Sequence, residues 1–192
     1  MTLIDESKFN SLEEFVDALD EELISLYKDL RESGFNYIKK IDSGYNFTKE
    51  EQKKLIPILL NHIQMDYHPR NKEMMALKLS TTKKLGRKEG WDIILNELKK
   101  TPPDEEISIP WRRGYKWALL VAIASMAGKE DVPTLLELVR DKSHGSQRMI
   151  LIDDISKSKN EEAKREIALM KDVPGFEQEI ARLQKKGRLP IV

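Results

Sequence analysis

The stretch Trp117-Ala-Leu-Leu-Val-Ala-Ile-Ala-Ser-Met-Ala127 decides the fold, because every face of it is apolar and Ser125 is its one polar side chain. Alanine and leucine favour a helix, and a helix that is apolar all round must be enclosed by other elements. The run is too short to cross a bilayer core, which needs about 20 residues. The sequence therefore predicts a central helix inside one all-α domain. We expect four of its side chains to be buried: Leu119, Leu120, Val121 and Ile123.

Three other segments share one apolar spacing, at offsets 0, 3, 4 and 7, which places four side chains on one face of a helix. They are Ile56, Leu59, Leu60 and Ile63, then Trp91, Ile94, Leu95 and Leu98, and then Val132, Leu135, Leu136 and Val139. The copies begin at positions 56, 91 and 132, and each interval has room for a second helix. The sequence therefore predicts helix pairs, with second helices over residues 71–85, 111–127 and 146–157.

Degenerate copies of the pattern lie near both ends of the chain. One begins at Ala163 and carries Glu166 where a leucine is expected, and an acidic copy begins at Leu12. Divergent end repeats suit a stack of helix pairs that meets water at both ends.

The third copy carries the closest family resemblance. Asp131-Val-Pro-Thr-Leu-Leu-Glu-Leu-Val-Arg-Asp141, followed by Ser146-Gln-Arg-Met-Ile-Leu-Ile-Asp153, resembles a HEAT-like (armadillo-type) repeat, in which a turn with aspartate leads into a second helix with an early arginine, here Arg148. The resemblance implies a right-handed α-solenoid, an α-α superhelix of stacked antiparallel helix pairs. It also implies a binding or scaffolding role, and it transfers no catalytic residues.

This interpretation divides the single domain into three parts. Residues 1–47 form an N-terminal acidic capping helix and a connecting segment, residues 48–172 form the HEAT-like helical repeats, and residues 173–192 form a C-terminal capping helix and tail. Residues 35–47 fit a short helix and a loop equally well.

Local signals mark several helix boundaries. Ser11 to Glu14 and Thr48 to Glu51 are capping boxes, in which each side chain satisfies an orphaned backbone donor of the first turn. The first box opens a helix that we expect to run to Gly34. Pro57 lies inside the helix that the second box opens, so we expect that helix to kink or restart near Ile56.

Charge is balanced overall but unevenly distributed. The chain has 33 basic and 33 acidic residues, whereas residues 1–32 hold ten acids against three bases. Between Arg70 and Lys88, seven bases face the single acid Glu73. These bases are either the solvated faces of helices or a basic surface that accepts an acidic partner.

Catalytic and metal-binding motifs do not emerge from the sequence. There is no cysteine, which excludes disulfides and thiolate chemistry. His62 and His68 would point apart on a continuous helix, and His144 in a turn is expected to be solvated. Adjacent acids on a helix diverge by about 100°, so they do not converge on one bond. We therefore expect no enzyme, cofactor or metal.

The start of the chain lacks a basic region followed by an apolar core, so we expect a cytoplasmic protein.

The polar cluster Trp111-Arg-Arg-Gly-Tyr-Lys116 immediately precedes the central helix. Bases at a helix amino terminus oppose the macrodipole, and either Asp104, Glu105 and Glu106 or an anionic partner compensates them. On the second interpretation, aromatic and basic side chains form one partner-binding face. The candidate residues are Lys72, Lys83, Trp111, Arg112, Arg113, Tyr115, Lys116 and Arg148.

Two functions from different classes fit these observations. The first is a non-enzymatic protein-binding module, of adaptor or inhibitor/immunity type, that binds an acidic partner protein through a basic, aromatic-flanked concave face. The second is a nucleic-acid-binding HEAT-like protein related to DNA-repair glycosylases, which would need a basic domain and a catalytic carboxylate. The sequence pI near 6.9 favours the first. No membrane segment is expected, and neither the partner's identity nor the oligomeric state can be inferred from the sequence.

Overall fold

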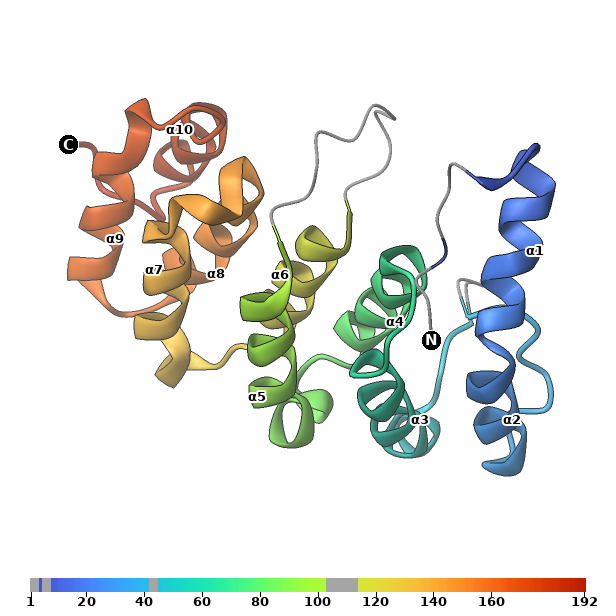
Figure 1. The fold of residues 1–192 in the computed structure, drawn as a ribbon. Coiled ribbons are helices and arrows are strands. Elements are labelled where there is room, and N and C mark those ends of the chain that lie inside the picture. Colours follow the sequence, from blue (N-terminus) through green and yellow to red (C-terminus); the bar gives the residue numbers. More distant parts are fainter. Residues whose placement is uncertain (1–3, 5–7, 42–44, 103–113) are drawn as a thin grey trace.

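The computed structural model describes residues 4, 8–41, 45–102 and 114–192, and these residues form helices and connections without a β-strand (Figure 1). The all-α class is therefore confirmed. The α-helices are α1 (Leu12–Glu22), α2 (Ile24–Glu32), α3 (Lys49–Ile63), α4 (Pro69–Thr82), α5 (Lys84–Lys100), α6 (Gly114–Met126), α7 (Val132–Arg140), α8 (Ile152–Lys157), α9 (Glu161–Leu169) and α10 (Glu177–Lys185). Short 3-10 helices are η2 (Lys129–Asp131), η3 (Lys142–Leu151) and η4 (Met170–Asp172). None of the described helices is both long and apolar enough to span a membrane.

Helix α6 holds the central position that its composition predicts. It packs against α4, α5 and η3, and the side chains of Leu119, Leu120 and Ile123 are fully buried. Val121 is partly exposed, contrary to expectation, as is Trp117 one turn earlier. The helix is therefore enclosed on all but one edge, and its open edge carries apolar side chains.

The remaining elements pack mainly on their neighbours in the sequence. Helix α3 contacts α2, α4 and α5, while α7 contacts η3, α8 and α9, and α8 also contacts α10. Figure 1 shows the elements following one another across the molecule, from α1 and α2 at one end to α9 and α10 at the other. Helices α4 and α6 match the second helices predicted for the first two pairs. Both lie within the predicted ranges, apart from two residues at the start of α4.

The second helix predicted for the third pair, over residues 146–157, is only partly α-helical. Residues 142–151 form the 3-10 helix η3, and α8 follows from Ile152. Gly145 breaks the helical conformation with φ 56° and ψ −151°, a region that glycine enters without strain from a Cβ. The pair α7 and η3–α8 therefore departs from two uninterrupted helices.

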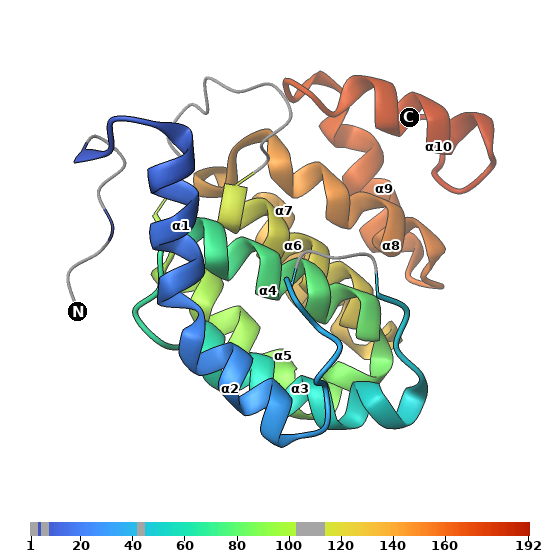
Figure 2. The same cartoon turned by 90° about the vertical axis from the view of Figure 1, so that its right-hand side faces the viewer.

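The N-terminal segment differs from the single helix that its periodicity predicts. Helix α1 ends at Glu22 and α2 begins at Ile24, with Leu23 between them fully buried. This break directs α1 across the amino end of α4 (Figure 2), where Phe15 packs edge-on against the ring of His68 at 5.5 Å. Contacts with a distant part of the chain thus override a continuous apolar stripe.

The structure contains some of the predicted helix caps and breaks but not others. Thr48 and Glu51 form the full reciprocal capping box, whereas Glu14 accepts the backbone N–H of Asn10 and not that of Ser11. Helix α3 runs without interruption through Pro57, so the restart expected near Ile56 does not occur. Pro57 is exposed, and water can therefore solvate the carbonyl that loses its backbone donor. Residues 35–41 and 45–47 contain no helix.

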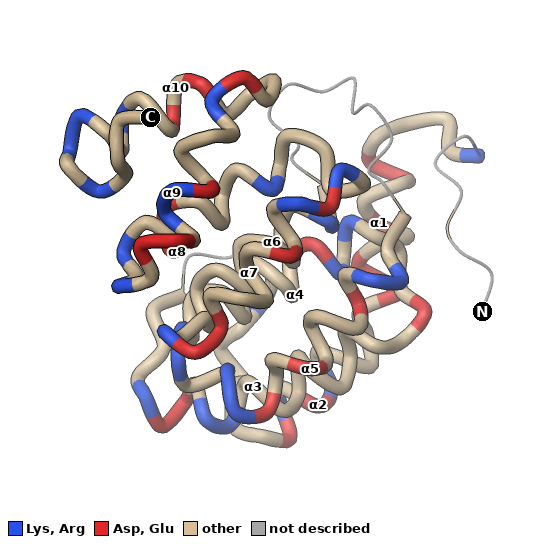
Figure 3. The backbone as a smooth tube through the Cα atoms, turned by 90° about the vertical axis from the view of Figure 1, so that its left-hand side faces the viewer, with Lys and Arg blue, Asp and Glu red and all other residues tan. Residues whose placement is uncertain are grey.

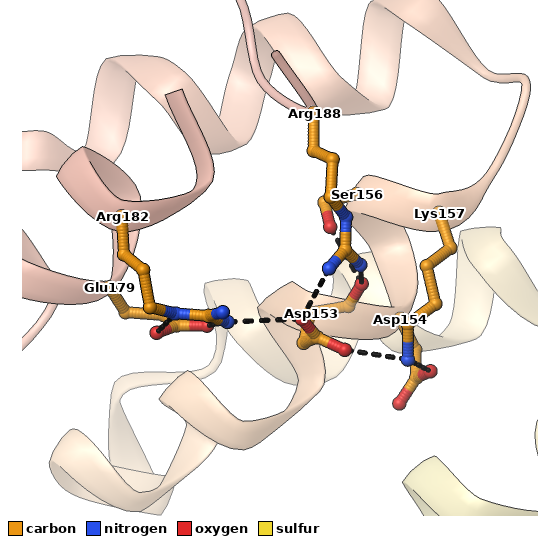
Figure 4. A network of polar contacts seen from close by, with 7 residues as sticks. All are labelled: Asp153, Asp154, Ser156, Lys157, Glu179, Arg182 and Arg188. Atoms are coloured by element: carbon orange, nitrogen blue, oxygen red, sulfur yellow. Dashed lines mark hydrogen bonds and ion pairs between the residues drawn. The ribbon is translucent and has the colours of Figure 1, made fainter. Parts of the chain in front are cut away.

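The C-terminal helix is fixed to α8 through one carboxylate (Figure 4). Asp153 accepts hydrogen bonds from Arg182 at 3.1 Å and from Arg188 at 2.9 Å, and Lys157 lies at 2.5 Å. Burial alone would raise the pKa of Asp153, but the hydrogen bonds from Lys157 and Arg188 outweigh it and lower the pKa to about 2. This network holds α10 and the tail after it against the rest of the molecule.

Candidate interaction surface

Two of the predicted partner-binding residues, Lys72 and Tyr115, meet at an internal carboxylate. Glu97 on α5 accepts a hydrogen bond from Lys72 Nζ on α4 at 2.8 Å and one from the Tyr115 hydroxyl on α6 at 3.2 Å. Lys72 Nζ also lies 5.4 Å from the centre of the Tyr115 ring, within range of a cation–π contact. The cluster therefore joins three helices around one buried charge.

The pKa shifts in this cluster reflect that burial. Burial raises the pKa of Tyr115 strongly, and the nearby charge of Glu97 raises it further. For Glu97 itself, burial would raise the pKa, but the hydrogen bond and charge of Lys72 outweigh it, so the carboxylate stays ionised. Lys72 and Tyr115 therefore satisfy a buried acid of their own chain.

Lys116 and Arg148 occupy a second place, on α6 and η3, two elements that pack against each other. Both are buried, and Lys116 Nζ donates a hydrogen bond to the backbone carbonyl of Ser143 at 3.2 Å. Arg148 Cζ lies 5.1 Å from the centre of the Phe176 ring. His144 is also buried here, so the expectation that it is solvated is wrong. The non-helical backbone of Gly145 changes the direction of the chain just after His144. The sequence pattern alone does not reveal this change.

The third place is the turn between α4 and α5, where Lys83 is exposed. The other candidates, Trp111, Arg112 and Arg113, lie outside the described residues. The five candidates that the structure describes are therefore distributed over three places, and only Lys83 has an exposed side chain.

The bases between Arg70 and Lys88 divide into two groups. Four are used within the fold: Lys72 binds Glu97, Lys78 lies over the Phe47 ring, Arg70 lies over the Phe15 ring, and Arg87 binds Asp131 through two nitrogens. The other three, Lys83, Lys84 and Lys88, are exposed, and no ion pair to them occurs among the described residues. We call these three the turn lysines.

Several features of the turn concentrate positive charge. Lys84 and Lys88 are four residues apart and share a face of α5, while Lys83 occupies its N-cap position. The first turn of α5 contains no acid and has no side-chain cap, so the macrodipole adds to the positive potential. Figure 3 shows basic and acidic positions interspersed along several other elements, with a further basic group at the end of α10. The sequence signal for the turn lysines was the i, i+4 spacing of Lys84 and Lys88.

The backbone of Lys83 is in an unfavourable conformation. Its φ of 52° and ψ of −132° lie in a region that glycine tolerates and a lysine does not, and no other non-glycine residue among those described has positive φ. Such a conformation costs about 1–3 kcal/mol. A residue with a side chain is therefore present where glycine would be less strained.

The histidines serve internal contacts and do not converge. His62 is fully buried, with Nε2 2.8 Å from Asp29 and Nδ1 2.7 Å from the Tyr67 hydroxyl, which also lies 2.7 Å from Ser25 Oγ. An ionised Asp29 can only accept, so Nε2 donates to it and a neutral ring accepts from Tyr67. The chain of hydrogen bonds fixes α2 to α3. In the described part of the chain no three metal-ligating side chains come together.

Comparisons with protein-family models, with curated proteins and with solved structures find no significant match for this chain.

Proposed function

We propose that the chain is a non-enzymatic binding module, a HEAT-like right-handed α-solenoid of adaptor or inhibitor type, that recognises an acidic protein. Support for the repeat architecture comes from the way successive elements pack: α3 and α5 contact each other, as do α4 and α6, and α6 contacts η3. Contacts of this kind are expected where helix pairs stack side by side.

The observation that carries the proposal is the set of turn lysines. Three exposed ammonium groups are held around the amino end of α5, and Lys83 and Lys84 each oppose the helix dipole at a cost of about 0.3–1 kcal/mol. The strain at Lys83 adds to that cost. An arrangement that lowers stability and has no ion-pair partner within the described part of the chain is explained if an external anion binds there.

The partner's chemistry follows from this geometry. Lysine ammonium groups are flexible point charges, so they suit a cluster of aspartate and glutamate side chains without demanding one planar geometry. Exposed charges at an interface mainly accelerate association and set its salt dependence. We therefore expect binding that weakens steeply as salt is raised above physiological ionic strength.

The experiment is a comparison of three baits in a lysate of the organism that encodes the chain. Wild type is compared with a variant in which the turn lysines are changed to glutamate. The matched control changes Lys39, Lys49 and Lys54 to glutamate, three exposed lysines with the same total charge change. An acidic protein captured by wild type and control, but not by the turn variant, is then purified and titrated.

Calorimetric titration of that protein should show affinity at least about tenfold weaker for the turn variant, or roughly 1.4 kcal/mol. Equal affinity for all three proteins would remove the turn from the interface. Saturable, sequence-independent binding of duplex DNA at physiological salt, lost in the turn variant, would instead favour the nucleic-acid alternative.

A further inference from the structure

Arg148 is a buried cation with very few partners. It is 8% exposed, and its one hydrogen bond to a described residue runs from a terminal nitrogen to the Arg140 carbonyl at 3.4 Å. Nε is buried and has no hydrogen-bond partner. Among the described residues no carboxylate pairs with Arg148, and the face of Phe176 is its other contact. A guanidinium has five N–H donors, and buried charges are normally paired, so Arg148 itself lacks an anionic partner among the described residues.

His144, four residues earlier and on the other side of the break at Gly145, presents a second unsatisfied group. It is 6% exposed, and its Nδ1 is buried without a hydrogen-bond partner. Nε2 lies 3.4 Å from the Asp141 carboxylate. Burial lowers the pKa of His144, the charge of Asp141 opposes that shift, and the charges of Lys116 and Arg148 lower the pKa further. Lys116 Nζ donates to the carbonyl of Ser143, the residue before His144, and Arg148 follows His144 by four residues in η3.

Asp141 does not satisfy Arg148. Its Oδ1 accepts the backbone N–H of Ser143 at 2.8 Å, and its Oδ2 faces His144. The Arg140 side chain, which precedes it, is paired with Glu166 on α9. The site therefore offers buried hydrogen-bond donors and fixed positive charge, and it borders exposed residues at 141–143, 145 and 146.

We propose that Arg148, with His144 and Lys116, forms a binding site for a phosphate-class oxyanion. The anion would accept hydrogen bonds from the Arg148 guanidinium and be held by the charge of Lys116, with His144 at its edge. This site lies between α6 and η3 and does not depend on the turn lysines or on their partner. The same chemistry would hold free phosphate or the phosphate of a small monoester.

The test is titration of the purified full chain with inorganic phosphate and, in a second arm, with O-phosphoserine. Calorimetry and thermal melting are run in chloride buffers of matched ionic strength. Wild type should bind phosphate with one-site stoichiometry and melt at higher temperature as phosphate is added. Arg148→Gln should weaken affinity by about tenfold or more, because a charge-assisted contact is lost. If phosphoserine binds and phosphate does not, the ligand is the monoester; the reverse result assigns it as the free ion.

Two controls separate the site from a purely structural role. Without phosphate, Arg148→Met should melt no lower than wild type, because removing an unpaired buried charge relieves desolvation. Lys116→Gln provides a second variant should Arg148 substitutions fail to fold. The turn variant (Lys83, Lys84 and Lys88 to glutamate) should bind phosphate as wild type does. Absence of binding to wild type, or phosphate binding that persists in Arg148→Gln and Lys116→Gln but is lost in the turn variant, would overturn the proposal.

Discussion

Both carboxylate oxygens of Glu22, the last residue of α1, accept the backbone N–H of His68, each at 2.9 Å. His68 is the N-cap residue of α4, so an acid 46 positions earlier in the chain caps that helix. Asn71 in the first turn of α4 donates to the same carboxylate at 2.7 Å. The negative charge also lies at the positive end of the α4 dipole.

Replacing Glu22 with alanine should therefore destabilise the fold. The change leaves the buried backbone N–H of His68 without its acceptor, and the Asn71 amide keeps only its bond to the Leu19 carbonyl, at a cost of about 1.5–3 kcal/mol. Urea unfolding followed by circular dichroism would measure it. The exposed neighbour Glu21, changed to alanine, is the matched control and should stay within about 0.5 kcal/mol of wild type. Similar midpoints for both variants would contradict the capping role.

Leu120→Asp should abolish folding. Leu120 is fully buried on α6, which packs against α4, α5 and η3, and a carboxylate there would be desolvated without a partner. The cost of several kcal/mol is comparable to the whole stability of an ordinary domain. Val121→Asp lies on the partly exposed edge of the same helix and should be better tolerated. A native-like melting transition for Leu120→Asp would show that α6 is not central.

Asp153 should make stability depend on pH in the acid range. Its pKa is lowered from 3.8 to about 2 in the folded chain. Its contribution to the free energy of unfolding is therefore fully present at pH values above the unfolded pKa. That contribution is lost as the pH falls through the pKa of Asp153 in the folded state. Because the group is partly exposed, we expect about 1–2 kcal/mol. Asp153→Asn should lower the free energy of unfolding at pH 6, and the difference from wild type should shrink by pH 3. Asp172→Asn, at an exposed site, is the control.

Chelation should leave the melting temperature unchanged. The nitrogens of His62 bind Asp29 and Tyr67, and Nδ1 of His68 accepts from the Arg70 backbone, so these rings are used within the fold. Addition of a strong chelator, followed by melting and by metal analysis of the protein, tests this expectation. A large drop in melting temperature would require a metal site outside the described residues.

Apolar periodicity predicted α3 and α7, because their burial depends on side chains that repeat along one helix face, and continuous apolar composition predicted α6. It failed where contacts between distant segments decide the outcome. The stripe from Leu12 to Leu30 is continuous in sequence, yet the chain breaks at Leu23 so that Glu22 can cap α4. Likewise, periodicity could not reveal that the chain is interrupted at Gly145, at the start of the second helix predicted for the third pair.

The candidate surface was harder to predict for a related reason. Charge counts identify bases but not their partners: Lys72 and Arg87 belong to the same basic stretch as Lys84, yet each has an acid on another element. Those acids, Glu97 and Asp131, are distant in sequence. Only the three-dimensional arrangement shows that Lys83, Lys84 and Lys88 remain at the surface.

Packing between neighbours in the sequence also determines where the molecule opens first. Helix α6 has partners on several sides, whereas α1 depends on few contacts beyond α2 and the amino end of α4. Amide protons of α6 should therefore exchange with solvent most slowly, close to the rate set by global unfolding, while those of α1 should exchange through local opening. The Asp153 network makes the two ends unequal, because α10 cannot detach without breaking it. Exchange in α10 should accordingly accelerate in Asp153→Asn, and the chain would then open from both ends.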